Sequence, residues 1–141
     1  MTTEERYVLD ASVIAKFLMR EEGWDDIAKL LRRGLLLGRV YTLDLAFKEV
    51  ANVLWKCHMR GLLRAETVEG LLDELSKLPV EKSSQTWKLL GRALQLSIGA
   101  RLPVYDTLYI ALAEELGAVL VTSDVKQREI AVRVLGRAIL I

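Results

Sequence analysis

Cysteine is nearly absent from this sequence, since Cys57 is the single one among 141 residues. A lone cysteine cannot form a disulfide within the chain, and residues 1–6 lack the basic and then apolar pattern of a signal peptide. No apolar run approaches the ~20 residues that a membrane-spanning helix needs. These absences argue against a disulfide-bonded or transmembrane protein, and we expect the cytoplasm as its compartment.

Several familiar kinds of active site are also missing. The only histidine, His58, has no partner at metal-ligand spacing except Cys57, which points in another direction on a helix. The glycines form neither a dinucleotide-binding nor a phosphate-loop pattern, and Ser12 and Ser97 have no histidine nearby to act as a base. A net charge of +1 gives no long-range attraction to nucleic acid, so a local basic patch must bind any RNA.

Hydrophobic residues make up 52% of the chain and charged residues 28%, a balance typical of a globular protein. The length fits one domain, which we expect to span residues 1–141. Short apolar runs alternate with segments of helical spacing. The expected strands are residues 7–9, 40–42, 79–80, 118–121 and 138–141, and the expected helices are residues 11–20, 24–37, 44–60, 64–78, 84–97, 106–116 and 125–135. This alternation predicts an α/β fold in which helices cover both faces of a parallel sheet.

Four acidic residues stand where such a fold would place a ligand. Asp10 and Asp124 each follow an expected strand and precede a helix, while Asp106 opens a helix after a loop. The carboxyl ends of parallel strands share one edge of a sheet, where ligands bind. Glu49 has no basic residue three or four positions away, so no ion pair along its helix explains it. Together the four carboxylates would suit one or two hard divalent cations, which take oxygen ligands.

Helix capping is the competing interpretation of the three aspartates. Asp is among the best N-cap residues, and all three stand where a helix is expected to begin. Gln127 follows Asp124 by three residues, which is a capping-box spacing. Both interpretations explain Asp at these positions, but only a metal site needs the negative charge.

Taken in order, these residues resemble the PIN-domain family and, within it, the small VapC-type toxin ribonucleases. The matching segments are residues 9–12, 49–54, 104–113 and 120–124, which read LDAS, EVANVL, VYDTLYIALA and LVTSD. The resemblance implies a three-layer fold with a parallel sheet of about four to five strands. It also implies Mg²⁺ or Mn²⁺ as cofactor, endonucleolytic cleavage of RNA, commonly a homodimer, and an antitoxin as a possible partner.

Carried over by position, the resemblance assigns the metal carboxylates and their polar supports. The metal-binding carboxylates correspond to Asp10, Glu49, Asp106 and Asp124, and the supports to Ser12 and Thr122. Many members carry a further acid shortly after the position of Asp124, whereas residues 126–128 here are Lys, Gln and Arg. The basic residues near these motifs, which we expect to contact phosphates, are Lys16, Arg20, Lys48, Lys126 and Arg128.

Two other functions compete with a nuclease. A haloacid-dehalogenase-like phosphotransferase would need an Asp two residues after Asp10, where Ser12 stands, and a receiver domain would need a Lys after its last strands. A PIN fold that serves only as an interaction module would have no reason to gather four charges that repel one another. The sequence therefore favours catalysis over both alternatives.

The span 62–98 is rich in leucine. Its apolar stripes at helical spacing are expected to be mainly core. This region carries more apolar helix surface than one thin sheet needs, and exposed apolar patches often mark interaction sites. We therefore expect a homodimer whose interface uses helices between Leu62 and Ser97.

Overall fold

The computed structural model describes residues 4–141; the first three residues, which begin the segment without a signal-peptide pattern, lie outside the described residues. Within 4–141, five strands form one sheet: β1 (Tyr7–Leu9), β2 (Val40–Leu43), β3 (Glu81–Ser83), β4 (Val119–Thr122) and β5 (Ala138–Leu140). All four neighbouring pairs are parallel, and the strand order is β3-β2-β1-β4-β5. The expected parallel sheet is thereby confirmed.

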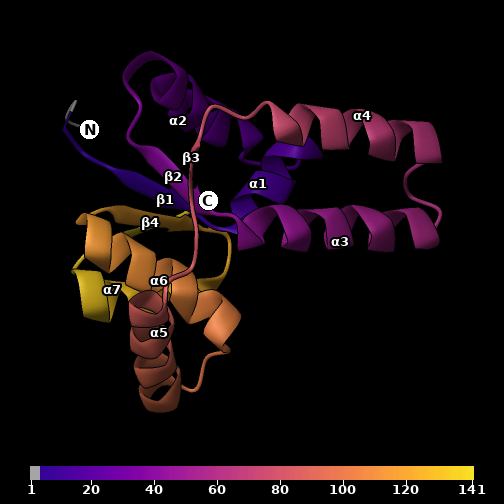
Figure 1. The fold of residues 1–141 in the computed structure, drawn as a ribbon. Coiled ribbons are helices and arrows are strands. Elements are labelled where there is room, and N and C mark those ends of the chain that lie inside the picture. The colour runs from indigo at the N-terminus through magenta and orange to yellow at the C-terminus, as the bar shows by residue number, and fades with distance from the viewer. Residues whose placement is uncertain (1–3) are drawn as a thin grey trace.

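Helices cover both faces of this sheet, as Figure 1 shows. In the described residues they are α1 (Ala11–Leu18), α2 (Trp24–Leu37), α3 (Leu45–Met59), α4 (Ala65–Ser76), α5 (Trp87–Ala100), α6 (Val104–Leu116) and α7 (Val125–Leu135). The chain moves from β1 to β2 and β3 in one direction across the sheet, and then crosses back to β4 and β5. Because crossovers between parallel strands are right-handed, this reversal places α1 to α4 on one face and α5 to α7 on the other. The fold is the expected three-layer α/β arrangement.

Several expected boundaries were wrong, and proline explains two of them. The third strand begins at Glu81 rather than covering residues 79–80, because Pro79 has no N–H to donate to the ladder with β2. The helix expected to open at Asp106 begins two residues earlier, at Val104. Pro103 has a φ of −57°, which directs the chain into that helix. Asp106 therefore lies inside the first turn instead of capping it.

The core is centred on β1, whose three residues are completely buried between β2 and β4. Helix α6 is buried along residues 107–113 because α5 covers the side turned away from the sheet. The Leu-rich span contributes less to this core than expected. Its buried members are Leu75, Leu78, Leu89 and Ala93, whereas its large exposed apolar residues are Leu62, Leu72, Trp87, Leu94 and Ile98.

This difference follows from where the helices lie. The hairpin of α3 and α4 extends past the edge of the sheet, and α5 packs on α6 rather than on a strand (Figure 1). One side of each helix therefore stays exposed. Among the described residues, no helix has both the length and the apolar character that crossing a membrane requires.

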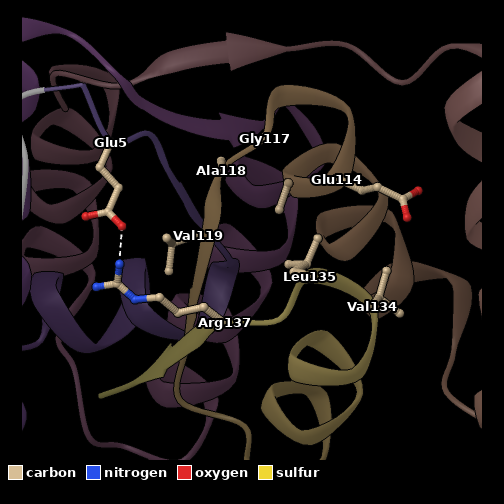
Figure 2. Close-up of a pocket in the computed structure, with 9 residues that line it drawn as sticks. Glu5, Glu114, Gly117, Ala118, Val119, Val134, Leu135 and Arg137 are labelled. Atoms are coloured by element: carbon tan, nitrogen blue, oxygen red, sulfur yellow. Dashed lines mark hydrogen bonds and ion pairs between the residues drawn. The ribbon is translucent and has the colours of Figure 1, made fainter.

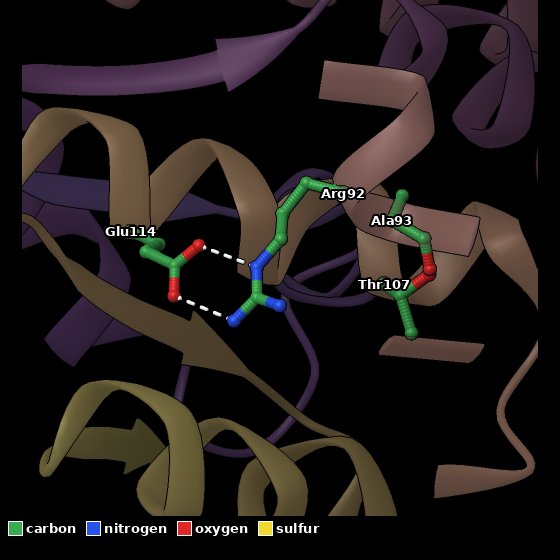
Figure 3. A network of polar contacts seen from close by, with 4 residues as sticks. All are labelled: Arg92, Ala93, Thr107 and Glu114. Carbon is green, nitrogen blue, oxygen red and sulfur yellow. Dashed lines mark hydrogen bonds and ion pairs between the residues drawn. The ribbon is translucent and has the colours of Figure 1, made fainter. Parts of the chain in front are cut away.

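Polar contacts join α5 to α6, and one of them lies next to Asp106. Arg92 donates from Nε and Nη2 to the two carboxylate oxygens of Glu114, at 2.8 and 3.0 Å (Figure 3). The buried hydroxyl of Thr107 donates to the carbonyl oxygen of Ala93 at 2.8 Å. Since Thr107 follows Asp106 directly, its hydrogen bond fixes the first turn of α6 against α5, whereas the pair of Arg92 and Glu114 joins α5 to the last turn of α6.

A glycine in α2 is required by close packing. An added Cβ at Gly34 would lie 2.5 Å from the carbonyl oxygen of Pro79 and 3.2 Å from the Cβ of Val40. We expect Gly34→Ala to lower the free energy of unfolding by roughly 1–3 kcal/mol, because the backbone oxygen cannot move aside cheaply. Urea denaturation measures this. The control is Gly91→Ala in α5, which has open space and should gain about 0.5–1 kcal/mol from helix propensity; equal stability of the two variants would contradict the packing explanation.

Candidate functional site

The strand order reverses between β1 and β4, so the carboxyl ends of these two strands form the topological switch point of the sheet. In open parallel sheets ligands bind at such a switch point, beyond the carboxyl ends of the strands. Asp10 follows the last residue of β1 directly, and Asp124 follows β4 by two residues. The topology therefore brings Asp10 and Asp124, which are 114 residues apart in the sequence, to the same edge of the sheet.

Asp10 is almost completely buried, with 3% of its surface exposed. Its Oδ1 accepts hydrogen bonds from the Ser12 hydroxyl at 2.6 Å and from the Val13 amide at 3.2 Å. Its Oδ2 accepts a hydrogen bond from the Thr122 hydroxyl at 2.5 Å. Burial raises the pKa of Asp10, and the charge of Asp106 adds to this, while the three hydrogen bonds oppose it. Asp10 caps α1 through Val13, but the two hydroxyl contacts go beyond what a cap requires.

Ser12 and Thr122 connect the ends of the two strands, in the positions where supporting side chains were expected. The Ser12 hydroxyl accepts a hydrogen bond from the Ser123 amide at 2.9 Å. The Thr122 hydroxyl accepts one from the Asp124 amide at 3.0 Å. Each hydroxyl thus donates to Asp10 and accepts from the segment that leads to Asp124, which fixes both acids in one network.

Glu49 is held by a tyrosine that the sequence analysis did not single out. The Tyr109 hydroxyl donates to Glu49 Oε1 at 2.6 Å. Half-burial raises the pKa of Glu49, and so do the charges of Asp10 and Asp106, against the hydrogen bond from Tyr109. Tyr109 lies three residues after Asp106, on neighbouring positions of one helix face. The local pattern of α6, which also carries Tyr105, did not distinguish Tyr109 for this contact.

Asp106 makes no capping hydrogen bond, so the cap interpretation was wrong for this residue. The N-cap position belongs to Pro103, whose side chain has no acceptor. Burial raises the pKa of Asp106, and the charge of Asp124 raises it further. Among the three aspartates, Asp106 is therefore the one whose carboxylate the fold needs least.

Asp124 does cap α7, since its Oδ1 accepts from the Gln127 amide at 2.8 Å. The expected capping box is only half formed. The buried Gln127 side chain instead donates from Nε2 to the Asp106 carbonyl oxygen at 3.1 Å. Gln127 thus joins α7 to the first turn of α6, a role that its spacing from Asp124 did not indicate.

The four acids act on one another electrostatically. The pKa of Asp10 responds to Asp106, that of Glu49 to Asp10 and Asp106, and that of Asp106 to Asp124. Among the described residues, none of the four has an ion-pair partner. In that same part of the chain, no three His, Cys, Asp or Glu side chains are gathered closely enough to hold a metal ion. The negative charges of the four acids are therefore not neutralised by any described cation, and the four side chains are spread apart.

Of the basic residues expected to contact phosphates, some have other partners. Lys16 donates to the Ile141 carbonyl oxygen at 2.9 Å, and Lys126 to the Arg101 carbonyl oxygen at 3.4 Å. Arg20 pairs with Glu74 at 3.0 Å. Lys48 and Arg128 are exposed and make no ion pair within residues 4–141. Lys48 is the one next in sequence to a candidate acid.

A hollow of about 310 Å³ lies at the opposite edge of the sheet, where β4 begins (Figure 2). Glu5, Glu114 and Arg137 supply its charged lining. Glu5 pairs with Arg137, and Glu114 pairs with Arg92 outside the hollow. Its charges are therefore already neutralised within the protein, and it stands apart from the four acids.

Comparisons with known proteins agree with this geometry. The PIN domain family model matches residues 7–133. Ribonuclease VapC3 of Pyrobaculum aerophilum is 38% identical over 120 residues, covering 84% of this chain and 89% of that protein. Ribonuclease VapC3 of Mycobacterium tuberculosis is 30% identical over 120 residues, covering 85% of this chain and 83% of that protein. The crystal structure of PAE2754 from Pyrobaculum aerophilum has the same fold, with a TM-score of 0.70, 22% identity, and coverage of 97% of this chain and 100% of the other. The chain belongs to the PIN domain family.

Proposed function

We propose that this protein is an endoribonuclease that hydrolyses RNA phosphodiester bonds, and that it is the toxin of a toxin–antitoxin pair. The observation that carries the proposal is the hydrogen-bond network in which Ser12 and Thr122 hold Asp10 and also bind the segment leading to Asp124 at the switch point of the sheet, with the charges of Glu49 and Asp106 acting on the same site. Two relatives that match most of the chain are named ribonuclease VapC3, which supports RNA as the substrate. We assign the catalytic site to these four acids, with Ser12 and Thr122 as supports.

A divalent cation fits the chemistry of this donor set. Every candidate ligand is a carboxylate oxygen, the kind that Mg²⁺ and Mn²⁺ take in proteins. No cation of the described chain pairs with the four acids, so their repulsion is uncompensated. Because the side chains are spread apart as they lie, we infer that they turn toward the ion when it binds. Glu49 and Asp106 are only half-buried and have room for that movement.

The residues would divide the work of hydrolysis. A bound Mg²⁺ or Mn²⁺ would supply Lewis acidity, which activates water and offsets charge on the phosphate. Ser12 and Thr122 hold the Asp10 carboxylate in one orientation through hydrogen bonds of 2.6 and 2.5 Å. Whichever of Glu49 and Asp106 does not hold the ion would accept a proton from the attacking water.

Cleavage of single-stranded RNA by the purified protein tests this proposal. We expect oligonucleotide products in Mg²⁺ or Mn²⁺ and none after excess EDTA, because the ion would supply the Lewis acidity that activates water. Adding the metal back in excess should restore cleavage. Cleavage that continues unchanged in EDTA would contradict the metal site, and no cleavage under any of these conditions would favour the interaction module.

The exposed apolar residues support two further proposals about partners. On α5, Trp87, Leu94 and Ile98 are spaced by seven and four residues, so they share one helix face. We propose that this face pairs two copies of the chain. On the α3–α4 hairpin, Trp55 and Met59 are also exposed, and we propose this surface for an antitoxin in the cytoplasm.

A further inference from the structure

We propose that a second hollow, next to the four acids, binds one base of single-stranded RNA beside the bond to be cut. This inference rests on the proposed ribonuclease function and names how that site would select its substrate. The hollow has a volume of about 450 Å³ and lies between the first turns of α3 and α6 and the segment that joins β3 to α5. Its volume falls within the ~300–1,000 Å³ of pockets that bind small ligands. We call it the α3–α6 pocket.

The position of the α3–α6 pocket follows from helix geometry. Leu45 lines it and lies four residues before Glu49, on the same face of α3. Tyr105 lines it and lies four residues before Tyr109, whose hydroxyl binds Glu49. On both helices the pocket is thus one turn, ~5.4 Å along the axis, from the contact between Glu49 and Tyr109. A nucleotide next to the reacting phosphate would reach it.

The lining of the pocket matches a flat ring with a polar edge. Its floor is apolar, made by Leu45, Leu90 and Leu108, of which Leu108 is buried. Its rim is polar and exposed, and includes Asp44 and Gln85. Apolar floors accommodate ring faces, while amide and carboxylate groups read the hydrogen-bonding edges of bases.

Two rim residues add the features that distinguish RNA from a simple anion. The Tyr105 side chain is 62% exposed, an aromatic surface on which a base can stack. Lys48 lines the pocket and directly precedes Glu49 in the sequence. It has no ion-pair partner among residues 4–141, so its ammonium group is available to a phosphate. Asp44 on the same rim would repel a free phosphate but accepts hydrogen bonds from a base amine.

The decisive experiment compares Tyr105→Ala with Tyr105→Phe. In EDTA, binding of a fluorescent single-stranded RNA oligonucleotide is followed by anisotropy; in Mg²⁺, KM and cleavage positions are measured on an RNA of mixed sequence. Loss of one stacked base is expected to weaken binding and raise KM by ~5- to 150-fold, whereas Tyr105→Phe keeps the ring and stays close to the parent. Asp44→Asn should change which base is preferred next to the cut.

The outcomes separate this pocket from the proposed function itself. A parent protein that cuts RNA, beside a Tyr105→Ala variant with the same affinity and the same cut positions, would overturn the pocket alone. A parent that neither binds nor cuts RNA would overturn both. If Tyr105→Ala fails to fold, which its exposure makes unexpected, the cut positions of Asp44→Asn decide: an unchanged profile rejects the pocket.

Discussion

Replacing Asp106 by Asn is expected to abolish RNA cleavage and leave the fold intact. Asp106 caps no helix and pairs with no cation in the described chain, so no structural contact depends on its charge. Asn has nearly the same size but lacks the charge that would hold a divalent ion. Loss of even an outer partner of a metal ligand costs ~10–100-fold in activity, and loss of a ligand should cost at least the upper value. Cleavage rate and a thermal melt of the same preparation measure the two effects.

The other acids extend this test, because their structural roles differ. Asp10 and Asp124 cap helices, and Asn caps about as well as Asp, so Asn should remove activity without loss of stability. Glu49→Gln keeps an oxygen that can accept from Tyr109. A matched control is Asp73→Asn, because Asp73 is an exposed acid on α4 that pairs with Lys77. This variant should cut RNA as fast as the parent does. Four variants that all cut as well as this control would show the proposed carboxylate site to be wrong.

A second expected result is that a divalent ion stabilises the parent and that, in the metal-free protein, Asp10, Glu49 and Asp106 contribute less to stability as pH rises. An ion that binds only the native state adds RT ln(1 + [L]/Kd), about 2.7 kcal/mol at 100 times Kd. The pKa values of Asp10, Glu49 and Asp106 are raised in the folded state, first by burial. The folded state therefore holds these protons more tightly than the unfolded state does. Their contribution to stability is full below the unfolded pKa, ~4, and is lost as pH rises through the folded pKa.

Comparison with Asp106→Asn isolates this effect. Glu5 and Glu114 have lowered pKa values, from the hydrogen bonds of Tyr7 and Arg92, and they change stability in the opposite direction over the same pH range. They are common to parent and variant and cancel in the difference. In EDTA, Asp106→Asn should gain stability relative to the parent as pH rises from about 4 to 7. Urea denaturation in EDTA and in Mg²⁺ measures both effects; a parent unaffected by millimolar Mg²⁺ and Mn²⁺ would count against the metal site.

Residues whose role depends on local pattern were predictable from the sequence. The apolar run at residues 7–9 followed by Asp10 specified a strand and its carboxyl end, and the parallel sheet followed from the alternation of strands and helices. The same reasoning placed Asp124 at the edge where Asp10 lies. The boundary error at α6 arose because Pro103, rather than the acid three residues later, starts the helix.

Residues whose role depends on tertiary contacts were not predictable in this way. The Tyr109 hydroxyl meets Glu49 across 60 residues of sequence, and Gln127 reaches the backbone of Asp106 across 21. No local spacing encodes either contact. The Leu-rich span was predictable only in part: surplus apolar helix surface was expected there, but periodicity marks an apolar face without saying which part of it is covered.

The central position of β1 has a consequence for when the protein becomes active during its synthesis. The Thr122 hydroxyl that holds Asp10 comes from β4 and is translated 112 residues after it. At about 5–20 residues per second, a ribosome needs several seconds to make the intervening chain. Until then β1 lacks its second neighbour and the acid lacks its partner. We therefore expect the proposed site to be assembled only after β4 has been made, so that a nascent chain still short of Thr122 does not cut the RNA around it.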